Sequence, residues 1–313
     1  MGRKKSKSRK IRQEILHFLI FVFFVLIYYA VKLMPSAAYP PFSRLAGMLF
    51  FYTMQTSRKL ILKNMDVAYG DTVSRAEKIR ICREVFVSIV LDLCETIQIG
   101  KISGKRLLSE SVIEGEDILR NALRQNRGVI GICPHMGNFP RLQAVMTKKG
   151  FPINCFARPP SGRHLAKFFA KLIGSVGVPL ISVSDKSKAV KESIKWLSKN
   201  GVLGFYMDQH SGGGVQVDFF GKKVFSPTGA AVLAKKFNCP VIGLFTCRRQ
   251  DGKQKIFIEG PYTLQKTGDT ARDIQTNTAF FMQRIEHHVR QHPEQWFTWL
   301  HKRFRTSKKK TKA

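Results

Sequence analysis

A histidine in the segment "ICPHMGNFPR" (residues 132–141) is the first side chain in this sequence whose position is suited to chemistry. His135 follows the apolar run "GVIGIC" and precedes Gly137 and Asn138. A histidine at the end of a strand can act as a general base when its imidazole is neutral near pH 7. It would remove the proton from a hydroxyl group, so that the oxygen attacks an acyl carbonyl.

Such a base usually depends on a carboxylate that holds its ring in one tautomer. Five residues after His135, where an acid would be sought, the chain has Pro140. Asn138 could orient the ring instead, or it could cap a helix that has Pro140 in its first turn. The carboxylate must then come from another part of the chain. Asp208 is the first candidate and Asp218 the second.

Two further segments carry groups suited to binding an anion. Arg158, in "FARPPSGR", offers a guanidinium fork for phosphate, although a surface ion pair would use the same residue. The segment "DQHSGGGVQVDFFG" (208–221) is expected to be a flexible polar loop. Its glycines would let backbone amides approach a phosphate or an oxyanion, unless it is a plain loop. Gly137 and Asn138, which follow His135, and His210, in this segment, are the further candidates for substrate binding.

Beyond about residue 112, short apolar runs alternate with helical patterns, which predicts an α/β fold with a mostly parallel central sheet flanked by helices. The expected strands include 128–133, 152–157 and 202–208, and two more around a "DGK" turn form a hairpin. Ligands of such sheets bind at the carboxyl ends of the strands. Because His135, Arg158 and Asp208 each end or follow one of these runs, we expect them at the same edge.

The N-terminal part of the chain has a different character. Ile15–Val31 is a run of 17 residues with no formal charge, about 25 Å long as a helix. A cleaved signal peptide and a core helix are the alternatives, but the basic cluster before the run favours a retained membrane anchor. A second apolar stretch, Leu45–Met54, would lie beside it, and residues 57–110 look helical.

The chain of 313 residues has a formal net charge of +32 at pH 7. Residues 2–12 and 302–313 each hold seven Lys or Arg and no acid, so the remainder is also strongly basic. A basic protein attracts nucleic acid, anionic lipid or an acidic protein. The six cysteines show no CxxC or zinc spacing, which indicates reduced thiols facing the cytosol and no metal site.

The segment "EQWFTWLHKRFRT" (294–306) combines two tryptophans with cations. It is either an end segment that packs Trp296 and Trp299 into the protein or an interfacial element that binds anionic lipid. The sequence has no GxSxG, no GxGxxG after a strand and no HExxH, which disfavours a serine hydrolase, a dinucleotide enzyme and a zinc protease.

An ordered series of segments resembles the bacterial late acyltransferases of lipid A biosynthesis, within the lysophospholipid acyltransferase superfamily. The series covers the chain from about residue 12 to 306. It runs through "SRKLILKNMDVAYGD", "VIEGEDILRNALRQNRGVIGICPHMGNF", "FARP", "GVLGFYMDQHSGGGVQVDFFGKKVFSPTGAAVLAKK" and "PEQWFTWLHKRF". Each piece alone is weak, whereas the order, the spacing and the terminal pattern together are fairly specific.

The resemblance implies an enzyme of the bacterial inner membrane whose active site faces the cytoplasm. It would move a fatty acyl chain from acyl carrier protein, or from acyl-CoA, to a hydroxyl of a lipid A precursor or related anionic glycolipid, without a cofactor. The family's catalytic histidine matches His135, and its arginine and aspartate match Arg158 and Asp208. The usual acid does not match, because Pro140 stands there. Either Asp208 or a neighbour supplies the carboxylate, or the enzyme is weak or altered.

The expected organisation is a basic cytoplasmic tail (1–14), a membrane anchor helix (15–34), a helical membrane-associated region (35–110), a catalytic acyltransferase domain (111–306) and a basic disordered tail (307–313). The alternative function is a catalytically inactive, membrane-tethered binder of anionic lipid. Nucleic acid is not expected as a partner, since the sequence has no recognisable binding module for it. Within the family, the acceptor could also be a phosphatidylinositol mannoside, a lysophospholipid or another glycolipid.

Overall fold

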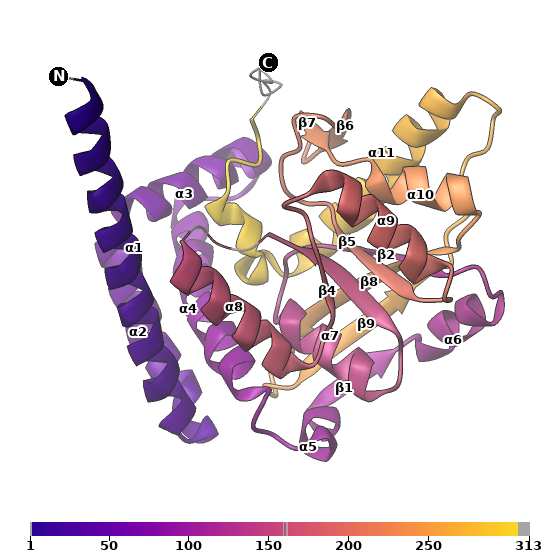
Figure 1. Ribbon diagram of the computed structural model, residues 1–313. Helices are drawn as coiled ribbons and strands as arrows, with labels where there is room; N and C mark the ends of the chain where they lie inside the picture. The colour runs from indigo at the N-terminus through magenta and orange to yellow at the C-terminus, as the bar shows by residue number, and fades with distance from the viewer. Residues whose placement is uncertain (1, 159, 161, 306–313) are drawn as a thin grey trace.

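The computed structural model describes residues 2–158, 160 and 162–305, and it describes the backbone alone at residues 2–13, 17, 173, 175 and 176. The predicted basic tail at 307–313 lies outside these residues. The described chain consists of a long N-terminal helix, a group of helices and a sheet covered by helices (Figure 1).

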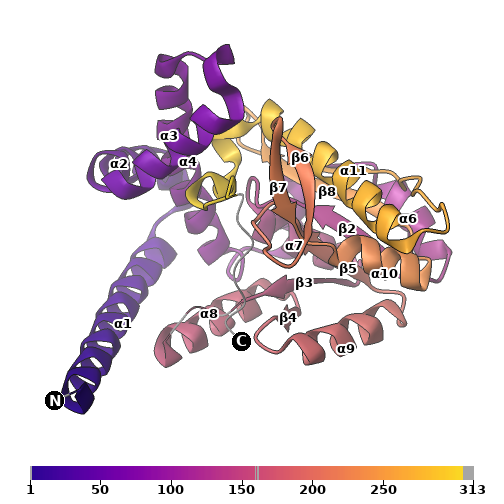
Figure 2. The same ribbon diagram turned by 90° about the horizontal axis from the view of Figure 1, so that it is seen from above.

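Helix α1 (Gly2–Leu33) joins the basic segment and the apolar run in one continuous element, so no break separates residues 2–14 from the predicted anchor. Its stretch Glu14–Leu33 has a mean hydropathy of 2.3 in its most apolar window, of which only 6% is buried. Among the described residues this is the one helix long and apolar enough to cross a membrane. Figure 2 shows α1 extending away from the sheet, with its N-terminus far from it.

Residues 35–110 form helices, as the sequence indicates. These are η1 (Ser36–Ala38), α2 (Tyr39–Thr53), α3 (Gln55–Tyr69), η2 (Gly70–Thr72), α4 (Arg75–Gln98) and α5 (Gly104–Ser109). The side chain of Ser74 caps α4 by accepting a hydrogen bond from the Glu77 amide (3.2 Å). Helix α2 lies closely against α4, since a Cβ on Gly47 would stand 2.7 Å from the Val87 backbone. The second apolar stretch belongs to α2, where Leu45 and Leu49 are exposed.

The central sheet has seven strands in the order β1-β9-β8-β2-β5-β3-β4. Neighbouring strands are parallel except for β8 and β9, which form the predicted hairpin. The α/β fold with a mostly parallel sheet is therefore confirmed. The strands are β1 (Ser111–Glu114), β2 (Val129–Cys133), β3 (Ile153–Ala157), β4 (Leu180–Ser182), β5 (Val202–Tyr206), β8 (Val241–Arg248) and β9 (Gln254–Glu259).

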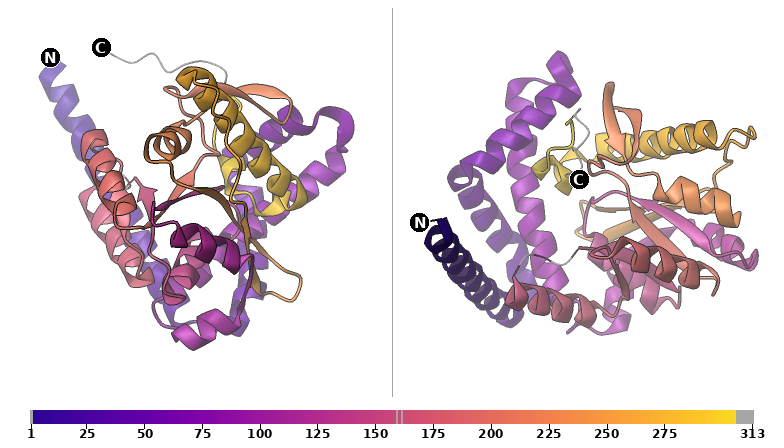
Figure 3. Two further views of the ribbon diagram at one scale, coloured as in Figure 1. Left: turned by 90° about the vertical axis from the view of Figure 1, so that its right-hand side faces the viewer. Right: turned by 45° about the horizontal axis from the view of Figure 1, so that its top comes forward.

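Helices cover both faces of this sheet (Figure 3). They are α6 (Glu116–Arg124), α7 (Phe139–Lys148), α8 (Arg163–Val176), α9 (Lys186–Leu197), α10 (Gly229–Phe237) and α11 (Thr270–Gln291). Strand β2 shows the division of the core. Ile130 and Ile132 pack with residues of α10 and α11, whereas Val129 and Cys133 pack with α6 and α7. Side chains that alternate along a strand point to opposite faces, so a fully apolar strand fills both cores.

The segment predicted as a flexible polar loop instead contains a second sheet. Strands β6 (Val215–Phe219) and β7 (Lys222–Ser226) pair antiparallel around Phe220 and Gly221. Both turn residues have positive φ (53° and 67°), as a tight two-residue hairpin turn requires. The alternation "VQVDF" before this turn was the available signal for a strand.

Candidate active site

The register of two strands explains how His135 and Asp208 meet. Strands β2 and β5 are parallel neighbours in which Cys133 lies opposite Tyr206. His135 and Asp208 each follow these partners by two residues, so both emerge at the carboxyl edge of the sheet. Arg158 directly follows β3, which is the next neighbour of β5. The three residues predicted at strand ends therefore belong to three adjacent strands.

The side chains of His135 and Asp208 form a direct pair. The His135 Nδ1 lies 2.7 Å from the Asp208 Oδ1. The other carboxylate oxygen, Oδ2, accepts hydrogen bonds from the His135 amide (2.9 Å), the Trp296 indole (2.8 Å) and the Thr298 hydroxyl (2.7 Å). Asp208 is completely buried. Asp208 thus lies where it can supply the carboxylate that the sequence lacks at Pro140.

These contacts determine the charge of Asp208. Burial acts to raise the pKa of its carboxyl, but the protonated form of the adjoining His135 ring and the hydrogen bonds from His135 and Thr298 lower it more. The net result is a pKa well below the usual range. Asp208 is therefore an anion at neutral pH and accepts a hydrogen bond from the Nδ1–H group of His135. This arrangement leaves the lone pair of the ring on Nε2.

The surroundings of the His135 ring hold it in place and leave one edge accessible. The ring lies against Tyr206, with centroids 4.4 Å apart, and Phe139 meets it edge-on at 5.2 Å. Its side chain is 18% exposed. Within the described chain no hydrogen bond to Nε2 is found. A neutral imidazole with a fixed tautomer and an open Nε2 is suited to accept a proton from a bound hydroxyl.

The C-terminal segment completes the site, which the sequence did not reveal. The Phe297 amide donates to the His135 carbonyl (2.9 Å), and the Gly137 amide donates to the Gln295 carbonyl (2.9 Å). Trp296 and Trp299 are fully buried, so the packing interpretation of this segment is correct and the interfacial one is wrong for these tryptophans. The "WxxWLH" pattern was the available signal that this segment belongs to the site. Only the fold shows that Trp296 bonds Asp208.

We expect Trp296→Phe to lower kcat about tenfold while the acceptor KM stays unchanged. The change removes the indole donor from Oδ2 of Asp208 and keeps an aromatic ring. One lost buried hydrogen bond to a charged group costs about 1.5–3 kcal/mol. Trp299→Phe is the matched control, because its indole donates to the Pro293 carbonyl (2.8 Å) and does not touch Asp208. Equal kcat values in the two variants would contradict a positioning role for Trp296.

Gly137 and Asn138, predicted as substrate-binding residues, shape the turn after His135. Gly137 has a φ of 54°, and a Cβ there would lie 2.7 Å from the Thr246 carbonyl oxygen. Asn138 is fully buried and caps α7 by accepting from the Arg141 amide (3.0 Å). Its amide nitrogen donates to Glu95 (3.0 Å). The capping alternative for Asn138, with Pro140 in the first turn of the helix, is confirmed.

The remaining candidates lie in different settings. Arg158 is exposed at the end of β3. His210 is partly buried, and its ring lies 6.1 Å from that of Phe225. Asp218 is on β6, where its exposed carboxylate pairs with Lys223 at 2.8 Å. Asp218 is therefore not the partner of His135.

A network of ion pairs lies next to the turn that follows His135. Arg248, at the end of β8, bonds Asp92 (2.8 Å) and Glu95 (2.6 Å) of α4. Arg141 pairs with Glu110 at 2.6 Å. Burial raises the pKa of Asp92 to about 7, against the lowering effect of Arg248. These residues are far apart in the sequence, so nothing in it indicated their contact.

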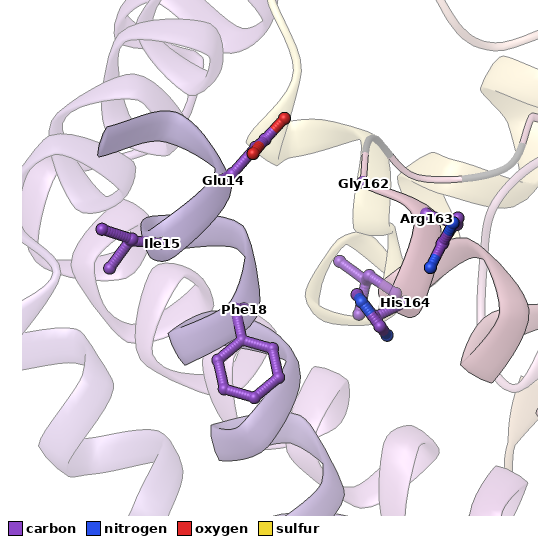
Figure 4. A pocket seen from close by; sticks show the side chains of 7 residues that line it. Glu14, Ile15, Phe18, Gly162, Arg163 and His164 are labelled. Carbon is purple, nitrogen blue, oxygen red and sulfur yellow. The ribbon is translucent and has the colours of Figure 1, made fainter. Parts of the chain in front are cut away.

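A hollow of about 720 Å³ lies between α1 and α8, where Phe18 faces His164 with ring centroids 5.9 Å apart (Figure 4). Its described lining includes neither His135 nor Asp208. In the part of the chain that the structure describes, no three His, Cys, Asp or Glu side chains gather to hold a metal ion.

Comparison with known families agrees with this geometry. The family model for bacterial lipid A biosynthesis acyltransferases matches residues 4–306, which is nearly the whole chain and includes the His135 turn, Asp208 and the Trp296 segment. No curated protein sequence gives a significant match. A match of this length shows that the chain is a member of the bacterial lipid A biosynthesis acyltransferase family, and hence an acyltransferase.

Proposed function

We propose that this acyltransferase moves a fatty acyl chain from acyl carrier protein, or from acyl-CoA, to a hydroxyl of a lipid A precursor or related anionic glycolipid. His135 is the general base in this proposal. The observation that supports it most strongly is the 2.7 Å contact between His135 Nδ1 and a buried, ionised Asp208, which leaves Nε2 open.

The proposed reaction uses each atom of this pair. The Nε2 of His135 takes the proton of the acceptor hydroxyl while its oxygen attacks the thioester carbonyl carbon. Asp208 stabilises the imidazolium that forms. The tetrahedral intermediate then collapses, the carbon–sulfur bond breaks, and His135 returns the proton to the leaving thiolate. The products are the acylated lipid and the free thiol of the donor.

We assign the binding of negative charge to Arg158. The amides of His135, Gly137 and Phe297 already donate to protein oxygens, so they are not available to an oxyanion. Arg158 is exposed at the same edge of the sheet and carries a permanent charge. It would hold the acceptor phosphate or the oxyanion of the intermediate.

The surface supports a place at the inner membrane with the active site on the cytoplasmic side. Leu16, Leu19 and Phe23 of α1 are exposed, as are Leu45 and Leu49 of α2. An apolar surface of this kind is typical of contact with lipid. The net charge of +32 would attract both an anionic acceptor and an acidic acyl carrier protein. The six cysteines are buried and are not joined by disulfides, as suits a cytoplasmic domain.

A transfer assay tests this proposal. Detergent-purified protein receives labelled acyl-acyl carrier protein or acyl-CoA together with a lipid A precursor, and the product is identified by mass spectrometry. An acylated acceptor with one of the two donors is the expected result. Pro140 is the feature that favours the alternative, an inactive binder of anionic lipid. That alternative predicts acceptor binding without product from either donor.

A further inference from the structure

We propose that a second pocket, separate from the His135 edge, binds the phosphate group of a membrane-borne lipid. This inference deepens the proposed function and rests on it only for the identity of the lipid. The pocket has a volume of about 890 Å³ and lies where the end of α1 meets α2, α4, α5 and the turn between β8 and β9. Figure 1 shows the lower end of α1 beside α2 and at about the height of α5.

The lining of this pocket, which we term the cationic pocket, has an excess of positive charge. Seven of its described lining residues are Lys or Arg and three are Asp or Glu. Arg248 and Arg141 in its floor are engaged with carboxylates, as described above. Arg44 has no hydrogen-bond or ion-pair partner among the described residues, and Arg249 has one contact, to the half-exposed Asp251 at 3.3 Å. Two guanidinium groups therefore remain for a ligand.

A buried group in the floor is an independent indication of a ligand. Arg141 is only 6% exposed, and its Nε has no hydrogen-bond partner within the described structure. A buried guanidinium N–H without an acceptor is costly, and such groups in native structures usually have a ligand or water as partner. A phosphate carries several acceptor oxygens and fits the planar fork of arginine. The chemistry of the lining thus suits a phosphate.

The position of the cationic pocket points to a lipid as the carrier of that phosphate. Leu33 is part of the lining, ends the apolar stretch of α1 and is 82% exposed. Leu45, next to Arg44, is 74% exposed. Headgroup phosphates lie at the ends of a membrane-embedded apolar segment, where Lys and Arg are commonly found. A lipid whose chains lie against Leu33 and Leu45 would place its phosphate in this pocket.

The cationic pocket is also connected to the active-site turn. Glu95 lines the pocket and accepts a hydrogen bond from Asn138 (3.0 Å), which caps α7 three residues after His135. An anion bound here would therefore contact the charge network that supports the catalytic turn. Two sources of the phosphate are chemically equivalent: the acceptor glycolipid and a phospholipid of the bilayer.

The test compares Arg44→Gln/Arg249→Gln with wild-type protein. Lys191→Gln/Lys195→Gln is the matched control, because it removes two charges from the exposed face of α9, outside the pocket. All four side chains are exposed, so both variants should fold. Calorimetry measures binding of dihexanoyl phosphatidic acid below its critical micelle concentration. Dihexanoylglycerol, which lacks the phosphate, is the comparison.

We expect the pocket variant to bind phosphatidic acid at least about tenfold more weakly than wild type and than the control. Equal binding by both variants, or equal binding of the two lipids by wild type, would overturn the proposal. No acyl donor is present, so the result does not depend on transfer activity. A second arm measures the acceptor KM in neutral detergent. A tenfold rise in the pocket variant indicates the acceptor phosphate as occupant, and an unchanged KM indicates a phospholipid.

Discussion

His135→Ala is expected to lower the rate of acyl transfer by about 10²–10⁴-fold. The substitution removes the group whose open nitrogen takes the hydroxyl proton in the proposed reaction. Binding of the acceptor should change little, because His135 contributes only a partly exposed ring. Single-turnover kinetics with saturating acyl donor measure the chemical step directly.

A control separates the loss of chemistry from loss of fold. His287→Ala changes a histidine of α11 whose ring contacts Gln291 and His288, and it should leave the transfer rate unchanged. His135→Ala itself should keep the thermal stability within a few degrees of wild type. A His135→Ala protein that is folded and retains more than a tenth of the wild-type rate would show that another group is the base.

Asp208→Asn should cost about 10³-fold in rate, for a reason of geometry. The asparagine oxygen can take the place of Oδ2 and keep the hydrogen bonds from Trp296 and Thr298. Its NH₂ group then faces Nδ1 of His135 and donates to it, which places the ring proton on Nε2. The imidazole is held in the wrong tautomer and cannot accept the hydroxyl proton.

The same substitution should change the dependence of stability on pH. The pKa of Asp208 is lowered from its ordinary value of 3.8 in the folded protein. Its ionised form therefore contributes stability above pH 3.8, and this contribution is lost as the pH falls toward the folded pKa. At pH 7 we expect the free energy of unfolding of Asp208→Asn to be about 1–2 kcal/mol lower than that of wild type. The difference should shrink under acid.

Chemical denaturation at several pH values checks this expectation. Asp218→Asn is the matched control, since Asp218 is exposed and pairs only with Lys223 in the described structure. It should leave both the rate and the stability near wild type. A stability difference between Asp208→Asn and wild type that grows as the pH falls would contradict the assigned ionisation.

The fold and the core of the site could be predicted from local patterns. Apolar runs bounded by turns indicated β2, β3, β5, β8 and β9, because a strand buried on both faces is apolar throughout. The rule that ligands bind at the carboxyl ends of parallel strands brought His135, Asp208 and Arg158 to one edge. The register of β2 and β5 in the structure then places His135 in contact with Asp208.

What could not be predicted depends on contacts between distant segments. The Trp296 and Thr298 bonds to Asp208 join residues 88 and 90 positions apart, and the network of Arg248 with α4 spans more than 150. Strand β1 is short and partly exposed, so its pattern was weak. Ser226 ends β7 and accepts a hydrogen bond from the buried Arg303, 77 positions away (2.7 Å).

A double-mutant cycle between His135 and Asp208 tests the central claim most directly. Single-turnover rates of acyl transfer are compared for wild type, His135→Ala, Asp208→Asn and the double variant. If the two residues act as one unit, removing the second group after the first costs little. The account predicts that the double variant is about as slow as His135→Ala alone. Losses that multiply across the two sites would contradict it, because Asp208 would then act independently of His135.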